Sequence, residues 1–282
     1  MQPERRAAVV GKPIAHSLSP VVHRAAYAAL GLQGWHYDAI ECDEHGLPDL
    51  VRSLAGPEWV GLSLTMPLKR VVLEIADSAS PLAREVGAAN TLVFGSSGSV
   101  ADNTDVAGLV GALRAAGVDT VERGLVLGAG GTAQAALAAL RALGERSPVV
   151  VVRDVARTHD LSATAERLGV RPTIRAGLPD LGGPLSGVVI STLPPGAADA
   201  VPVPAVAAGC VVLDVVYAPW PTPFAAAAAR GGARTVSGLE MLLHQAAAQV
   251  TLMTGRPPPV AAMRTALEEA VAARTRTGAA GG

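Results

Sequence analysis

The feature that most constrains the fold of this chain is a repeated alternation of short apolar strands with helical patterns. In the second half, continuous valine-rich runs at 149–152 and 211–216 alternate with helical patterns such as 131–143. Strands that alternate with helices indicate crossover connections and a largely parallel sheet. Continuous apolar runs are typical of strands buried on both faces. The pattern therefore predicts an α/β fold.

The same alternation places the individual elements along the 282 residues. Strands are expected at 7–10, 35–40, 59–64, 124–127, 149–152, 188–191 and 211–216, with a hairpin from 91–94 and 99–101. Helices are expected at 21–30, 45–54, 105–116, 131–143, 161–168, 238–254 and 259–274, and a further one after Lys69.

Composition excludes several classes of protein. Half of the residues are apolar and 17% are charged, which argues against disorder. The 23 basic and 24 acidic residues leave no excess charge for binding nucleic acid or an anionic membrane. The longest uncharged stretch, 181–198, is broken by glycines and prolines, and the N-terminus lacks a signal-peptide pattern, so a soluble cytoplasmic protein is expected. Cys42 and Cys210 form no CxxC pattern, and no metal site is expected.

The strongest local motif follows the strand at 124–127. Gly128-Ala129-Gly130-Gly131-Thr132-Ala133 opens a helix there and forms a GxGxxA pattern. Its first glycine allows a tight turn, its second lets the backbone approach a pyrophosphate, and its alanine permits close packing of helix on strand. The alternative is a glycine-rich turn that has the same sequence pattern and binds no ligand. The flanking strands and helix favour a dinucleotide, whose phosphates the helix N-terminus would bind.

The end of the next strand distinguishes NAD from NADP. Enzymes that use NAD usually place an acid there, on the ribose 2′-hydroxyl. Here the strand ends at Val152 and is followed by Arg153, Asp154 and Arg157. Arginines favour the 2′-phosphate of NADP, and we expect the carboxylate of Asp154 to turn away from it. The alternative for both arginines is a solvated loop.

Polar clusters that a core does not need occupy the first 105 residues. They lie at 11–20, 63–69, 87–91 and 102–105, mostly after expected strands. Open α/β sheets bind ligands at the carboxyl ends of their strands. The clusters contain hydroxyls, amides, carboxylates and Lys69, one of only two lysines in the chain. Such groups suit a small polyhydroxylated acid.

Seven segments, in order and over nearly the whole chain, resemble the shikimate dehydrogenase family. They are GKPIAHSLSP, the TxPxK stretch, GAANT, DNTD, GAGG, YxPxxTPF and GLEMLLHQA. The resemblance implies reversible NADPH-dependent reduction of 3-dehydroshikimate to shikimate in aromatic amino-acid biosynthesis. It also implies an N-terminal α/β substrate domain, over 1–104 and completed by C-terminal helices over 239–282, and a Rossmann-type NADP domain over 105–238.

The resemblance further implies the residues of the site. Lys69 and Asp105 would be the catalytic pair. The substrate would be bound by Ser17, Ser19, Thr65, Lys69, Asn90, Asp105, Tyr217 and Gln245. NADP(H) would be bound by Gly128, Ala129, Gly130, Gly131, Thr132, Ala133, Arg153, Arg157, Thr192, Val215, Gly238 and Met241.

Three positions depart from the family pattern. Ser63 stands where the family usually has an asparagine, and we expect it to donate to a backbone carbonyl as a variation of the scaffold. Asp154 follows Arg153 in the segment expected at the 2′-phosphate, which bears on how strictly the protein prefers NADP. Val215 replaces a methionine and removes apolar bulk near the nicotinamide.

The chemistry of ketone reduction fits the two catalytic candidates. The carbonyl oxygen must receive a proton, which a lysine ammonium can donate while it stabilises the developing alkoxide. A neighbouring carboxylate would orient that ammonium. Considered alone, Lys69 could instead form an exposed ion pair, and Asp105 could cap the helix that follows it.

Two other functions stay open at this stage. One is an NAD-dependent quinate/shikimate dehydrogenase. The other is a catalytically silent sensor that binds NADP and a small acid, although a sensor would need neither Lys69 nor Asp105. The expected partners are small molecules, and the chain would act as a monomer or a homodimer.

Overall fold

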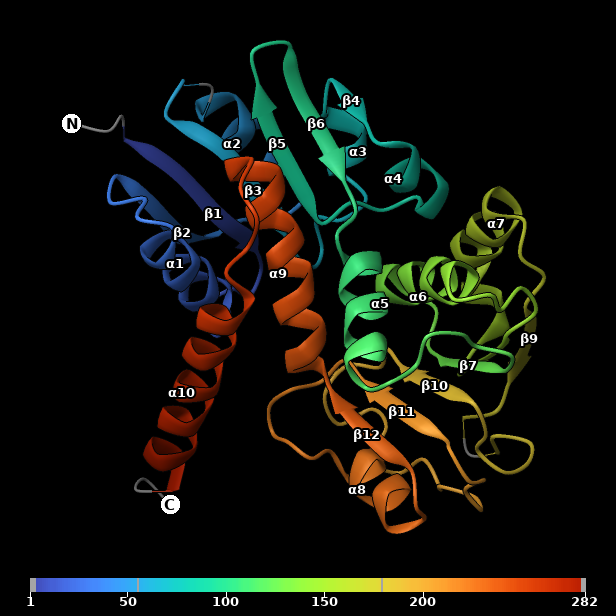
Figure 1. Ribbon diagram of the computed structural model, residues 1–282. Helices are drawn as coiled ribbons and strands as arrows, with labels where there is room; N and C mark the ends of the chain where they lie inside the picture. Colours follow the sequence, from blue (N-terminus) through green and yellow to red (C-terminus); the bar gives the residue numbers. More distant parts are fainter. Residues whose placement is uncertain (1–3, 55, 179, 280–282) are drawn as a thin grey trace. The chain divides into compact units, whose positions relative to one another are not determined.

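The computed structural model describes residues 4–54, 56–178 and 180–279, and the chain forms two compact units, each with its own six-stranded sheet (Figure 1). Unit 1 extends to Arg84, resumes over Ala88–Thr104 and returns from Leu242 onward. Unit 2 consists of Glu85–Gly87 and Asp105–Met241. The chain therefore crosses back to unit 1 after Met241, three residues beyond the boundary expected from the sequence.

Unit 1 is a mixed sheet with helices from both ends of the chain. Its strands are β1 (Arg5–Gly11), β2 (Trp35–Glu41), β3 (Trp59–Leu64), β4 (Ser78–Ala79), β5 (Thr91–Gly95) and β6 (Gly98–Asp102). They lie in the order β2-β1-β3-β5-β6-β4, with β1 parallel to both neighbours and β5 antiparallel to β3 and β6. The hairpin expected from 91–94 and 99–101 is confirmed as β5 and β6.

The helices of unit 1 come from distant parts of the sequence. They are α1 (Ser19–Ala29), α2 (Leu47–Ser53), α3 (Val72–Ile75), α4 (Pro81–Val86), α9 (Gly238–Thr254) and α10 (Val260–Ala279). The last two residues of α4 and the first four of α9 group with unit 2. The long helix α10 packs against α1, so the last helix of the chain lies beside the first (Figure 1). The helix expected after Lys69 is only the single turn of α3.

Unit 2 is an all-parallel sheet in a Rossmann-type arrangement. Its strands are β7 (Gly124–Leu127), β8 (Val149–Val152), β9 (Thr173–Ala176), β10 (Val188–Ser191), β11 (Val211–Asp214) and β12 (Arg234–Ser237). The order is β12-β11-β10-β7-β8-β9. The chain thus switches direction between β7 and β10, and the carboxyl ends of strands at such a switch point form a ligand-binding crevice.

The helices of unit 2 connect these parallel strands. They are α5 (Asp105–Ala115), α6 (Gly131–Ala142), α7 (His159–Leu168), α8 (Pro223–Arg230) and a short 3-10 turn at Val155–Arg157. The valine strand β8 and the strand β11 are buried almost throughout, as their valine-rich sequences predict. The α/β fold with a mostly parallel sheet is therefore confirmed. Within the described residues, no helix combines the length and apolarity that a membrane crossing requires.

Candidate active site

The loop after β1 carries the two serines predicted to bind substrate. Ser17 Oγ accepts a hydrogen bond from the backbone N–H of Ser19 at 3.2 Å, and this contact shapes the loop as it enters α1. The side chain of Ser19 is buried, whereas Ser17 is partly exposed. Ser17 thus lies in the segment that follows the carboxyl end of the parallel strand β1, and Ser19 is the first residue of α1. Ligands bind at this end of the strands in sheets of this kind.

The loop after β3 packs closely against the loop after β1. The Thr65 N–H donates to the Val10 carbonyl at 3.0 Å, and Ala89 N–H donates to the Lys69 carbonyl at 2.7 Å. A β-carbon added to Gly11 would overlap the methyl group of Thr65 and crowd the Met66 carbonyl, so this approach requires glycine. The substrate candidates Thr65 and Lys69 are thus fixed by backbone bonds to neighbouring segments.

Asn90 is buried directly before β5, and both the oxygen and the nitrogen of its side-chain amide form hydrogen bonds. Its Oδ1 accepts from the Thr104 N–H at 2.7 Å and from the hydroxyls of Thr91 and Thr104, each at 3.0 Å. Its Nδ2 donates to Gln245 Oε1 of α9 at 3.3 Å. The structure therefore brings together Asn90 and Gln245, two predicted substrate residues separated by most of the chain.

In unit 2, Asp105 is the first residue of α5, and only 4% of its surface is exposed. The loop that carries Tyr217 is held by Asp214, the last residue of β11. The Asp214 carboxylate accepts from the Val216 N–H at 3.2 Å and from the Thr222 hydroxyl at 2.7 Å. Burial raises the pKa of Asp214, while these hydrogen bonds oppose that shift. The sequence analysis missed Asp214, although its place before the YxPxxTPF segment was a usable signal.

The residues of the GxGxxA turn fit a dinucleotide phosphate. Gly128 has a φ of +113°, and an added β-carbon would overlap Thr192 Oγ1 across the switch point. Thr192 is fixed there, since its hydroxyl donates to the Leu127 carbonyl at 2.8 Å. A β-carbon on Gly130 would meet no atom within 4 Å, and α6 begins there without a side-chain cap. The open space and uncapped N–H groups suit an anion.

Three further cofactor candidates lie close together in the same unit. A β-carbon on Gly238 would overlap the backbone of Val215, so this contact between the start of α9 and the loop after β11 requires glycine. Met241 lies about one turn further along α9 and is buried. Val215, Gly238 and Met241 therefore belong to one corner of unit 2.

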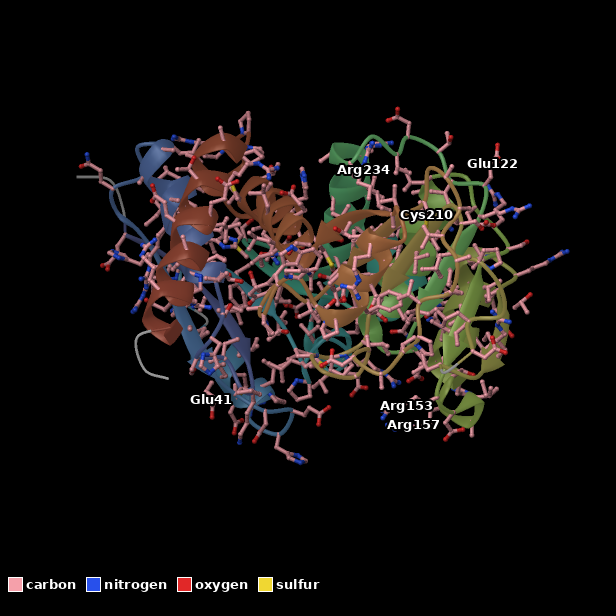
Figure 2. The ribbon with its side chains drawn as sticks, turned by 90° about the horizontal axis from the view of Figure 1, so that it is seen from below. Glu41, Glu122, Arg153, Arg157, Cys210 and Arg234 are labelled. Carbon is pink, nitrogen blue, oxygen red and sulfur yellow. The ribbon has the colours of Figure 1, made fainter. Side chains whose placement is uncertain are left out.

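The segment after β8, which is expected to distinguish NAD from NADP, forms a 3-10 turn. Asp154 Oδ1 accepts from the Ala156 N–H at 2.9 Å and so caps the 3-10 turn of Val155–Arg157. The carboxylate is therefore engaged by its own turn. Arg153 and Arg157 are exposed on either side of it, and Figure 2 labels both.

Comparisons with known proteins identify the family. A sequence model described as the shikimate dehydrogenase substrate binding domain matches residues 9–92, and one described as the shikimate 5′-dehydrogenase C-terminal domain matches 238–268. The chain is 41% identical over 257 residues to shikimate dehydrogenase (NADP(+)) of Caulobacter vibrioides, covering 89% of this chain and 90% of the relative. The chain belongs to the shikimate dehydrogenase family.

Solved structures of family members agree over nearly the whole length. The crystal structure of Mycobacterium tuberculosis shikimate dehydrogenase is 44% identical, with a TM-score of 0.80, and covers 94% of this chain and 99% of its own. The Thermus thermophilus enzyme, solved in complex with NADP(H) and shikimate, is 33% identical with a TM-score of 0.82 and the same coverage. The recognition of the shikimate dehydrogenase family from seven segments is thus confirmed.

Ser63, the departure from the family pattern after β3, has a different partner from the one expected. Its hydroxyl donates to the side-chain Oε1 of Gln249 at 2.8 Å, and no backbone carbonyl is its acceptor. The expectation of a backbone partner was wrong because Gln249 lies 186 residues further along the chain and only the fold brings it there. Gln249 itself was missed by the sequence analysis. Among the described residues, no group of three His, Cys, Asp or Glu side chains could hold a metal ion.

Proposed function

We propose that the chain catalyses the reversible NADPH-dependent reduction of 3-dehydroshikimate to shikimate, with Lys69 and Asp105 as its catalytic pair. The observation that carries this is similarity to shikimate dehydrogenases over about nine-tenths of both chains, on a chain that retains both residues. We further propose that unit 1 binds the substrate, that unit 2 binds NADP, and that the enzyme acts on small molecules in the cytoplasm.

The substrate residues have complementary chemical roles. The serine hydroxyls of the β1–α1 loop suit the carboxylate of the substrate, as donors at the end of a strand. Thr65, Asn90, Tyr217 and Gln245 offer hydroxyl and amide groups for the ring hydroxyls. In support, the buried amides of Asn90 and Gln245 are hydrogen-bonded to each other and so present fixed orientations.

The proton of the reaction is assigned to Lys69. NADPH, when bound, supplies the hydride. The Lys69 ammonium donates a proton to the substrate oxygen as the carbonyl becomes a hydroxyl, and it stabilises negative charge on that oxygen beforehand. In the oxidation of shikimate the neutral amine accepts that proton. Asp105 orients the ammonium and the neighbouring hydroxyl of the substrate.

An absorbance assay tests the function. The purified protein is supplied with shikimate or quinate, each with NADP⁺ or NAD⁺, and reduced cofactor is followed by its absorbance at about 340 nm. Shikimate with NADP⁺ should give the highest kcat/KM of the four pairs. Fastest turnover of quinate with NAD⁺ would establish the NAD-dependent alternative instead. Binding of shikimate and NADP⁺ without turnover would establish a sensor.

Removal of either serine hydroxyl should weaken substrate binding. Ser17→Ala and Ser19→Ala each remove a candidate hydrogen bond to a charged carboxylate, which is worth about 1.5–3 kcal/mol. Isothermal titration with shikimate measures the change. Ser53→Ala is the matched control, because the Ser53 hydroxyl only bonds a carbonyl of its own helix. Unchanged shikimate affinity in both variants would make the two serines simple turn residues.

The two arginines after β8 should determine the preference for NADP. Arg153→Ala or Arg157→Ala should cost about 1.5–3 kcal/mol of NADP⁺ affinity, roughly 10–150-fold, with little change for NAD⁺. Fluorescence titration with each cofactor measures both constants. Arg146→Ala is the control, since Arg146 is an exposed arginine just before the opposite end of β8.

A substitution at Asp154 separates the two cofactor hypotheses. Asp154→Thr removes the negative charge and keeps a side chain that can cap the 3-10 turn. NADP⁺ should then bind equally or more tightly. A wild-type preference for NAD⁺, together with weaker NAD⁺ binding in this variant, would identify Asp154 as the ribose ligand.

A further inference from the structure

Gln249 is a buried glutamine at the centre of unit 1, one turn after Gln245 on α9. Only 1% of its surface is exposed, yet its amide makes three hydrogen bonds to side chains and backbone of unit 1. Nε2 donates to the Asn90 carbonyl at 3.3 Å and to Thr91 Oγ1 at 3.0 Å. Oε1 accepts from the Ser63 hydroxyl at 2.8 Å. One side chain thus joins α9 to the end of β3 and the start of β5.

The chemistry of its partners fixes the orientation of the Gln249 amide. A carbonyl can only accept, so the amide nitrogen must face Asn90 and the oxygen must face Ser63. Ser63 Oγ accepts from the Tyr37 hydroxyl at 2.6 Å, which leaves its own proton for Gln249. Beyond Gln249, the Thr91 hydroxyl donates to Asn90 Oδ1. The donors therefore run in one direction, from Tyr37 to the side chain of Asn90.

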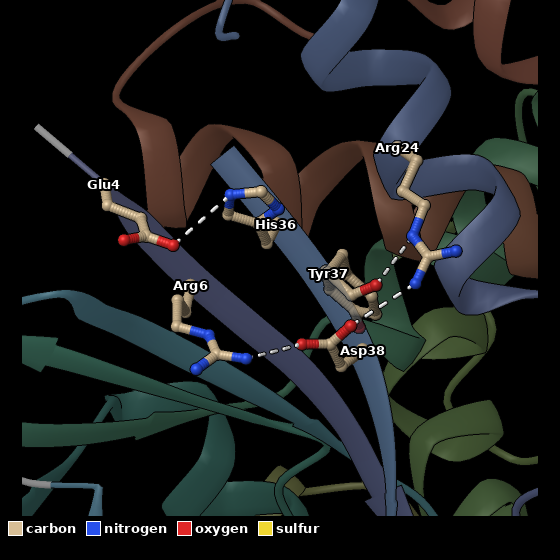
Figure 3. A network of polar contacts seen from close by, with 6 residues as sticks. All are labelled: Glu4, Arg6, Arg24, His36, Tyr37 and Asp38. Atoms are coloured by element: carbon tan, nitrogen blue, oxygen red, sulfur yellow. Dashed lines mark hydrogen bonds and ion pairs between the residues drawn. The ribbon is translucent and has the colours of Figure 1, made fainter. Parts of the chain in front are cut away.

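Tyr37, at the other end of this series of hydrogen bonds, is also held in place by its neighbours. The Arg24 Nε–H donates to the Tyr37 carbonyl at 2.8 Å (Figure 3). The Tyr37 ring also stacks on His23, with ring centroids 4.0 Å apart. Complete burial lowers the pKa of His23 to about 4, against the weaker opposing effects of the Ser19 carbonyl and the nearby Gln249. His23 is thus neutral near pH 7, and its Nδ1–H donates to the Ser19 carbonyl at 2.9 Å.

We propose that Gln249 is a positioning residue of the substrate site, which acts through Asn90 by fixing the start of β5 against α9. An apolar side chain of similar size would fill the space without burying an amide. The amide instead sets a single register between the two elements that present Asn90 and Gln245, and it orients Thr91, which orients Asn90 in turn. The proposal rests on the proposed function, in which Asn90 contacts the substrate.

Gln249→Leu removes all three hydrogen bonds at similar volume. Shikimate Kd and KM should rise about tenfold or more, because small displacements of positioning groups have large effects. Calorimetric titration and steady-state kinetics below the melting temperature measure these values. NADP⁺ Kd should stay within about twofold, since the cofactor candidates belong to unit 2. Thr251→Ala on the same helix is the control, because its hydroxyl only bonds the Ala247 carbonyl.

Gln249→Glu gives a readout that a purely structural residue would not affect. The new carboxyl group keeps the shape of the amide, and burial raises its pKa. Protonated, it can donate to Thr91; ionised, it has no proton to donate and repels the Asn90 carbonyl. Shikimate affinity relative to wild type should therefore be retained near pH ~6 and lost toward pH ~9.

The outcomes separate this proposal from the proposed function. Wild-type shikimate Kd in a folded Gln249→Leu protein with a lowered melting temperature would overturn the positioning role and leave the enzyme assignment intact. If that variant does not fold, a Gln249→Glu protein whose shikimate affinity follows wild type at every pH overturns it. A wild-type protein that neither binds nor oxidises shikimate overturns the proposed function itself.

Discussion

Replacing Lys69 with alanine should lower kcat by about 10²–10⁴-fold and leave shikimate binding nearly unchanged. The proton donor acts on the transition state, so its loss reduces turnover more than ground-state affinity. Steady-state kinetics with NADP⁺ and calorimetric titration with shikimate measure the two effects. The chain has only one other lysine, Lys12, so the same substitution at that residue is the matched control.

The control variant for Lys69→Ala is therefore Lys12→Ala. The Lys12 ammonium forms an exposed ion pair with Asp43 at 3.2 Å, and exposed pairs contribute little to stability. Its removal should leave kcat and KM close to wild type. A Lys69→Ala enzyme with kcat within about threefold of wild type would exclude Lys69 as the proton donor.

Replacing Asp105 with asparagine should lower kcat by about 10²–10⁴-fold as well, because it removes a buried negative charge without changing the shape of the side chain. Combination with Lys69→Ala should be no worse than the stronger single variant, since residues that act as a unit are non-additive. Rates of the two single variants and the double variant test this. Asp119→Asn, at an exposed carboxylate after α5, is the control. A double variant that shows the product of both losses would mean that the two residues act independently.

The sequence predicted the buried parts of the fold better than its edges. Strand β8 and the first three residues of β11 are continuous apolar runs because they are buried in the sheet, and such runs are recognisable in isolation. The strands β9 and β12 were missed. They are the two edge strands of the sheet in unit 2, and their partly exposed, mixed sequences lack both a continuous run and a clear alternation.

The candidate site shows a similar division. The GxGxxA turn was predicted because its backbone conformation requires particular residues at adjacent positions, and Gly128 has the positive φ that this implies. Gln249 and its partners could not be predicted in the same way. Tyr37, Ser63, Thr91 and Gln249 are ordinary polar residues in sequence, and their hydrogen bonds join positions that only the tertiary fold brings together.

Unit 1 consists of three separate segments of the chain, so its parts are synthesised at different times. Chains fold largely by domain as they leave the ribosome, with N-terminal parts appearing first. Unit 2 is complete once Met241 has been synthesised, whereas unit 1, whose first strand begins at Arg5, still lacks α10 and the part of α9 from Leu242 onward. Until then the Asn90 carbonyl and the hydroxyls of Ser63 and Thr91 have no Gln249 to bond. The first strands to be synthesised therefore belong to the unit that is finished last.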